Sequence, residues 1–163
     1  MRPTRRFCAI GVILLSAVVT CSQAPAAAAL PGALRAHLKN ERLDLVTSVR
    51  GLPLGVRDAL QKLFVSQTLD IAEPGAEFQA TDVVVKPKLP TRRLLAAGCS
   101  TDHCLVYYER GGLAHSWHVA LFHWTPAATQ LDFGGTAPGG LARIEDVRQA
   151  VLSGAIKAPG RGW

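Results

Sequence analysis

The segment Cys99–Cys104 concentrates side chains that could do chemistry in this 163-residue sequence. Four polar residues stand between its two cysteines: Ser100, Thr101, Asp102 and His103. In an oxidising compartment such a pair of cysteines forms a disulfide. The bond would close a small ring and hold the hydroxyl groups, the carboxylate and the imidazole in one pose. We therefore predict a Cys99–Cys104 disulfide and a rigid polar tip whose four residues contact a partner. The alternative is a stapled hairpin end with merely solvated side chains.

Nucleophilic catalysis is the first chemistry to weigh, since serine, aspartate and histidine form hydrolytic triads. Neighbours in so small a ring cannot easily make both the Ser–His and the His–Asp hydrogen bonds of a relay. Oxidised cysteines offer no thiolate. The sequence has no Gly-x-Ser-x-Gly, phosphate-loop or dinucleotide motif, and a Glu109–Asp132 acid pair would be accidental. We predict a protein that is not an enzyme, without catalytic residues or a cofactor.

Metal binding is the second chemistry that these residues could support, because imidazole is a common zinc and copper ligand. Four histidines gather around the segment: His103, His115, His118 and His123. Strand alternation puts His115 and His123 on one face and His118 on the other. His115 and His123 are also separated by roughly 26 Å of strand. An approach of His118 to His103 through strand pairing stays open, but we predict no metal site.

Two strands must position the ring, and the sequence predicts them at Leu94–Gly98 and Leu105–Arg110. Gly111-Gly112 then indicates a two-residue hairpin, since both glycines can take positive φ. A long aromatic strand follows at Leu113–Trp124. This register predicts three cross-strand pairs: Arg110 with Leu113, Tyr108 with His115 and Val106 with Trp117.

The remaining pattern predicts helices on either side of the strands in the sequence. An apolar stripe at helical spacing marks Gly55–Phe64. A second helix begins near Ile144 and ends at Ser153-Gly154. Further strands are expected at Thr81–Val85 and at Thr129–Phe133, where Gly134-Gly135 would end the strand. The predicted fold is α+β, an antiparallel sheet of about five strands flanked by two or three helices, with one disulfide-clipped loop.

The N-terminus has the pattern of a secretory signal peptide. Three arginines precede the apolar run Phe7–Val19, which is too short to span a bilayer. We expect residues 1–29 to be removed on export to the periplasm, leaving 30–163 as a single α+β domain without an integral membrane segment. Lipid anchoring at Cys21 is disfavoured, because Thr20 is a poor fit before an anchored cysteine. Removal takes away three basic residues and no acidic one, which lowers the net charge from +6 to +3. The remaining basic residues form no stripe for nucleic acid.

The ring and its surroundings resemble the inhibitor of vertebrate lysozyme family, whose hallmark loop reads Cys-Lys-Pro-His-Asp-Cys. Here the loop reads Cys-Ser-Thr-Asp-His-Cys, with the same spacing but with histidine and aspartate in the opposite order. The resemblance covers about residues 94–156. It includes the apolar strand Leu94–Ala97, the turn-like Asp132–Gly135 and the closing Val151–Ile156.

The resemblance implies an exported inhibitor that blocks the cleft of a lysozyme or another glycosidase with this loop. The family's inhibitory histidine is carried to His103, with Asp102 beside it. Two alternatives stay open: a non-catalytic envelope interaction or stress protein with another target, and a histidine-based metal-binding module. A homodimer is also left open.

Overall fold

The protein is seen in a computed structural model that describes residues 29–83 and 86–159. Residues 1–28 of the predicted signal peptide lie outside this range. Within these ranges, three α-helices, one 3-10 turn and five strands follow in the order α1 (Gly32–Asn40), β1 (Asp44–Val46), the 3-10 turn (Val49–Gly51), α2 (Leu54–Leu63), β2 (Arg92–Cys99), β3 (His103–Arg110), β4 (Ser116–Trp124), β5 (Thr129–Ala137) and α3 (Ile144–Ser153). Within the described ranges, no helix has the length and apolarity needed to cross a membrane.

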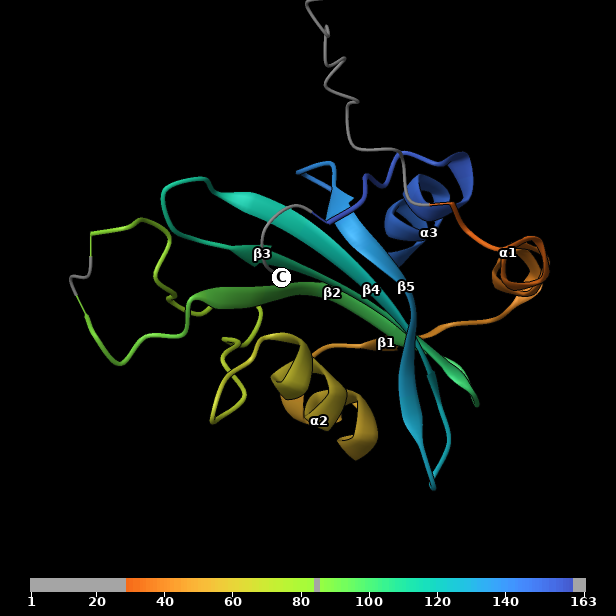
Figure 1. Cartoon of the computed structure of the whole chain (residues 1–163), viewed down its shortest axis with the longest axis horizontal. Helices are drawn as coiled ribbons and strands as arrows, with labels where there is room; N and C mark the ends of the chain where they lie inside the picture. Colours follow the sequence, from red (N-terminus) through yellow and green to blue (C-terminus); the bar gives the residue numbers. More distant parts are fainter. Residues whose placement is uncertain (1–28, 84–85, 160–163) are drawn as a thin grey trace, which may run out of the picture.

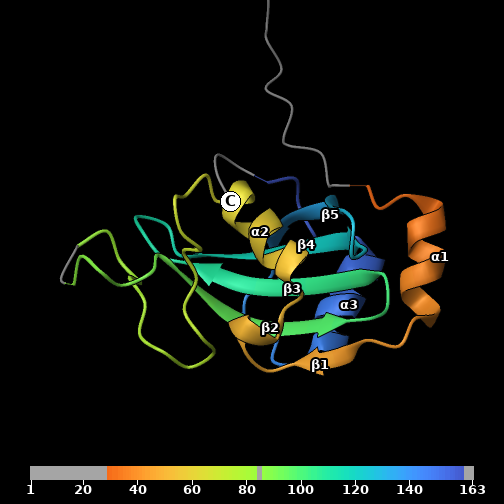
Figure 2. The same cartoon turned by 90° about the horizontal axis from the view of Figure 1, so that it is seen from below.

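The five strands form one antiparallel meander in the order β1-β2-β3-β4-β5. Helix α2 packs on one side of the sheet and α3 on the other, while α1 stands at one end (Figures 1 and 2). The predicted α+β class, with an antiparallel sheet, flanking helices and a clipped loop, is confirmed.

Two apolar cores lie on the two faces of the sheet, because alternate residues of a strand point to opposite sides. In β3, Leu105 and Tyr107 join the core under α1 and α3, whereas Val106 and Tyr108 join the core under α2. All four side chains are fully buried. The sheet is therefore a middle layer that is covered on both sides.

The flanking helices form where the apolar spacing predicts them. Helix α2 buries Val56 and Leu60, one turn apart. Helix α3 begins with two acidic residues, Glu145 and Asp146, which suit the positive end of the helix dipole. It ends at Gly154, whose φ of 79° lies in the left-handed region that glycine adopts without strain.

The predicted two-residue hairpin after β3 is wrong. The loop spans residues 111–115, and the observed pairs are Arg110 with Ser116, Tyr108 with His118 and Val106 with Ala120. Gly111 allows a close approach of two backbone segments and forms no tight turn. Its N–H donates to the carbonyl of Thr91 (3.0 Å), and a Cβ at this position would overlap the carbonyl oxygen of Gln79. Leu113, the predicted strand start, is almost fully exposed.

Two predicted strand boundaries also differ. Residues 81–83 of the predicted strand Thr81–Val85 form a bend, and the neighbouring edge of β2 pairs instead with Ala72, through Arg93. Val84 and Val85 lie outside the described residues. Gly134 and Gly135 do not end β5, which runs on to Ala137. The missing side chain of Gly135 admits the backbone of Lys157, which exchanges two hydrogen bonds with Thr136 (3.0 and 2.9 Å).

Candidate functional site

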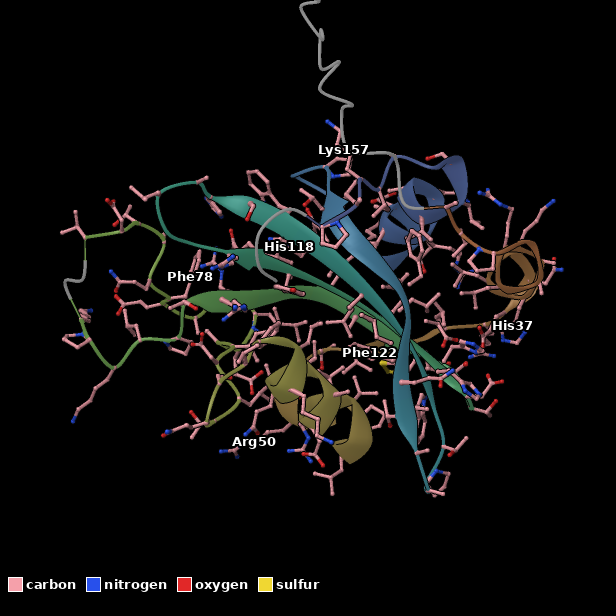
Figure 3. All side chains as sticks on the ribbon, in the orientation of Figure 1. His37, Arg50, Phe78, His118, Phe122 and Lys157 are labelled. Carbon is pink, nitrogen blue, oxygen red and sulfur yellow. A yellow bond between two sulfur atoms is a disulfide. The ribbon has the colours of Figure 1, made fainter. Side chains whose placement is uncertain are left out.

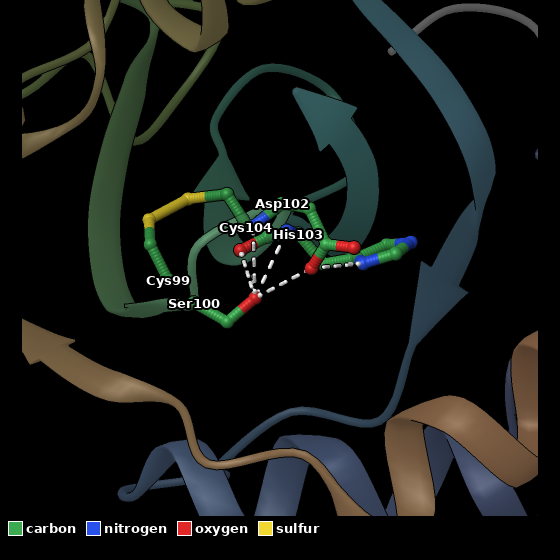
Figure 4. Close-up of a disulfide and its surroundings, with 5 residues drawn as sticks. All are labelled: Cys99, Ser100, Asp102, His103 and Cys104. Atoms are coloured by element: carbon green, nitrogen blue, oxygen red, sulfur yellow. Dashed lines mark hydrogen bonds and ion pairs between the residues drawn. A yellow bond between two sulfur atoms is a disulfide. The ribbon is translucent and has the colours of Figure 1, made fainter. Parts of the chain in front are cut away.

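The predicted disulfide closes the turn between β2 and β3 (Figure 4). Cys99 and Cys104 are the last register pair of the two strands, so the bond lies where the strands already meet. The ring therefore sits at one end of the sheet, beside α1 (Figure 1).

Ser100 fixes the inside of the ring. Its Oγ accepts hydrogen bonds from the N–H groups of Asp102 (3.3 Å) and His103 (3.0 Å). The hydroxyl lies 3.2 Å from Oδ1 of Asp102, to which it can donate, and the Ser100 N–H donates to the carbonyl of His103 (2.7 Å). A serine that bonds its own turn in this way holds the loop without a partner.

The structure separates the four predicted contact residues by exposure. Thr101 is exposed and Ser100 is half-buried. The Asp102 side chain is 41% exposed. His103 is only 7% exposed, which differs from the expectation that its imidazole reaches into a partner. As the first residue of β3, it shares the inward face of Leu105 and Tyr107.

The imidazole of His103 lies between two other histidines. Its ring centroid is 4.4 Å from that of His37 and 5.1 Å from that of His123. His123 pairs with His103 across β3 and β4, whereas His118 pairs with Tyr108 further along the sheet. The approach of His118 to His103 that the sequence left open is therefore not observed.

Helix α1 adds two groups that the sequence pattern around the ring did not reveal. His37 and Glu41 are four residues apart at the end of this helix, a spacing that puts them on one face. His37 Nε2 lies 3.1 Å from Glu41 Oε2 and 3.6 Å from Asp102 Oδ1. His103 Nδ1 lies 3.0 Å from Asp102 Oδ1 and 3.8 Å from Glu41 Oε1. The i, i+4 spacing is visible in the sequence, but nothing there connects it to the ring.

The charge of Asp102 is stabilised in this cluster. Burial raises the pKa of its carboxyl group, but hydrogen bonds with His103, Glu41 and Ser100 and the charge of His103 outweigh burial. The pKa of Asp102 therefore lies below its ordinary value. The loop presents a carboxylate, partly open to solvent, at neutral pH.

A second polar group lies at the opposite end of β3. Glu109 is 4% exposed and pairs with Arg93 across the strands, with 2.6 Å from Oε1 to both Nε and Nη2. Its Oε2 lies 2.7 Å from Nε2 of His115. These residues line a cavity of about 510 Å³. Phe78, labelled at that end in Figure 3, contributes to the same wall, far from His37.

No protein-family model, no curated protein and no solved structure matches this chain. The inhibitor resemblance therefore stays an expectation from the loop and its surroundings. A proposal about function has to depend on the geometry of the ring and of the α1 cluster.

Removal of the disulfide should lower stability moderately. The double variant Cys99→Ser/Cys104→Ser loses a constraint on a six-residue ring, which the loop-entropy model values at about 2 kcal/mol. Urea unfolding of the variant and the oxidised parent would measure the difference in free energy of unfolding. A variant as stable as the parent would mean that the Ser100 hydrogen bonds suffice to hold the turn.

Proposed function

We propose that this is an exported interaction protein that docks the exposed edge of the Cys99–Cys104 loop in the cleft of a lysozyme or another glycosidase. The observation that carries the proposal is the covalently closed tip with Thr101 exposed and Asp102 partly exposed. The contact groups are these two side chains. His103 orients the Asp102 carboxylate from behind, at 3.0 Å, and does not itself enter the cleft.

The chemistry of such a cleft suits these groups. A glycosidase carries a protonated carboxylic acid and an ionised carboxylate on the two sides of the scissile bond. The carboxylate of Asp102 can accept a hydrogen bond from the acid, and the hydroxyl of Thr101 can donate one to the carboxylate. The two enzyme groups lie about 5–9 Å apart, so neighbouring side chains of one loop can address both.

Rigidity of the loop supports tight docking. The disulfide and the three contacts of Ser100 already hold the backbone in one conformation. Binding then costs little additional ordering of the loop, which leaves more of the contact free energy for affinity.

Thr101→Arg should weaken inhibition roughly tenfold or more, equivalent to about 1.4 kcal/mol of binding free energy. A long charged side chain at the exposed tip obstructs insertion without disturbing the fold, because Thr101 packs in no core. Lysis of a peptidoglycan suspension by several lysozymes, measured against inhibitor concentration, gives the potency.

The matched control is His115→Ala, which changes a half-exposed side chain at the far end of the sheet and should keep full potency. Reduced and oxidised parent protein are assayed side by side, with chelator present throughout. If a large molar excess of oxidised parent leaves every lysozyme tested fully active, the inhibitory role is lost.

A further inference from the structure

We propose a divalent transition-metal site, best suited to Zn²⁺, between the end of α1 and the disulfide loop. Four candidate ligand atoms converge there, all within 4.8 Å of one another: one each from His37, Glu41, Asp102 and His103. This proposal is argued from other observations than the docking proposal, but the two share the carboxylate of Asp102.

The spacing of the four groups fits one ion. Four ligands held at about 2.0–2.1 Å around a tetrahedral zinc lie roughly 3.3–3.4 Å from one another. The observed contacts bracket that value: 3.1 Å from His37 to Glu41, 3.0 Å from His103 to Asp102, 3.6 Å from His37 to Asp102 and 3.8 Å from His103 to Glu41. The contacts to His37 and His103 involve different oxygens of Glu41, and the four ligand atoms lie within 4.8 Å of one another, so side-chain rotations would be needed to complete a tetrahedral sphere.

Glu41 supplies an independent indication. Its side chain is 8% exposed, and its Oε2 lies 3.1 Å from Nε2 of His37, an ion-pair contact without the geometry of a full hydrogen bond. A buried carboxylate that is incompletely hydrogen-bonded is costly, and here a second carboxylate, that of Asp102, lies beside it. In the metal-binding form, with both imidazoles deprotonated and both carboxyl groups ionised, the four ligands would carry a charge of −2, which a dication neutralises.

The surroundings of His103 match those of a metal-bound histidine. Its Nδ1 faces the cluster, and its Nε2 faces Oδ2 of Asp132 at 3.8 Å on the other side. Asp132 is itself held by Gln130, whose Nε2 donates to Oδ1 at 2.8 Å. At 3.8 Å this carboxylate makes no hydrogen bond, but a modest approach would let it fix the tautomer and orientation of a ligating imidazole.

The ligand types favour zinc over the hard cations. Calcium and magnesium prefer oxygen ligands, whereas imidazole suits zinc and its neighbours in the first transition series. The ligands also come from two distant parts of the sequence, the end of α1 and the β2–β3 turn. A bound ion would therefore tie α1 to the rigid end of the sheet.

The test is isothermal titration of the untagged, oxidised full chain with ZnCl₂ after dialysis against chelator and then against metal-free buffer. One zinc per chain is expected, and CoCl₂ should give the visible absorption of tetrahedral cobalt. Glu41→Gln should weaken zinc binding by roughly a hundredfold or more, since a ligand is lost. Asp132→Asn should weaken it by roughly tenfold, as is usual for a residue that supports a ligand.

His123→Gln is the matched control, because the His123 ring contacts that of His103 but is not one of the four ligands; this variant should bind zinc like the parent. Circular dichroism checks the fold of each variant, and the half-exposed His37→Gln replaces Glu41→Gln if the latter does not fold. Equal zinc affinity in the ligand variants and the parent, or calcium binding as tight as zinc binding, would overturn the site. Thr101→Arg should retain zinc, so a failure of docking and a failure of metal binding remain distinguishable.

Discussion

Glu109→Ala is expected to lower the free energy of unfolding by about 3–5 kcal/mol, the usual cost of breaking a buried ion pair from one side. The carboxylate of Glu109 lies opposite Arg93 in the β2–β3 ladder and contacts its guanidinium twice at 2.6 Å. It also contacts His115 at 2.7 Å. Truncation leaves a half-buried guanidinium without its carboxylate and opens space beside the cavity.

A matched control exists in the same cavity wall. Glu77 pairs with Lys86 at 2.6 Å, but both side chains are exposed, and solvent screens such pairs. Glu77→Ala should therefore leave the unfolding curve unchanged within error. Urea titration of the parent and both variants at neutral pH measures the contrast. A loss below about 1 kcal/mol for Glu109→Ala would mean that the ion pair contributes no more than a surface pair.

Stability is also expected to fall as the pH is lowered from about 6.5 to about 4, through His118. This side chain is 3% exposed and stacks on Tyr108, with ring centroids 5.3 Å apart. Burial, reinforced by the positive charges of Arg110 and Arg92, lowers the pKa of His118 to about 4. Between pH 4 and 6.5, His118 is protonated in the unfolded chain but not in the folded chain. Lowering the pH therefore favours unfolding.

The expected loss is about 2–3 kcal/mol, after allowance for some solvent screening. It is absent above pH 6.5 and complete near pH 4. The lowered pKa of Asp102 acts at more acidic pH, below the ordinary value of 3.8, and so outside this window.

His118→Phe keeps a stacking ring but cannot take up a proton, so its stability should be nearly flat between pH 4 and 6.5. His123→Gln, at the other end of the same strand, should keep the parental slope. Unfolding midpoints in urea at pH 4, 5, 6 and 7 give the comparison. If His118→Phe loses stability with acid as steeply as the parent, another group is responsible.

Local patterns predicted the fold class and most elements because they report which face of an element is buried. The stripe of α2, the glycine stop of α3 and the apolar runs of β2 and β3 all carry such information. The hairpin after β3 failed for a different reason. Gly111 is required because the backbone of Gln79 packs too close for a side chain. This contact is distant in sequence, so no local pattern reveals it.

The candidate site also has a part that local sequence predicts and a part that depends on long-range packing. The disulfide and the polar ring were predictable from six consecutive residues. The face of His103 was also accessible, since it has the same strand parity as Leu105 and Tyr107, but its burial was not, because β3 is covered on both faces. The convergence of His37 and Glu41 on the ring was not, because it depends on how α1 packs at the end of the sheet.

The two-sided packing of β3 has a mechanical consequence. This strand is the common wall of two apolar compartments, so peeling a helix from either face also loosens the support of the other. Loss of either compartment would expose one buried face of β3, so we expect the two compartments to unfold together. The disulfide turn and the Glu109 cluster, at the two ends of β3, are therefore joined by a strand that is buried on both faces.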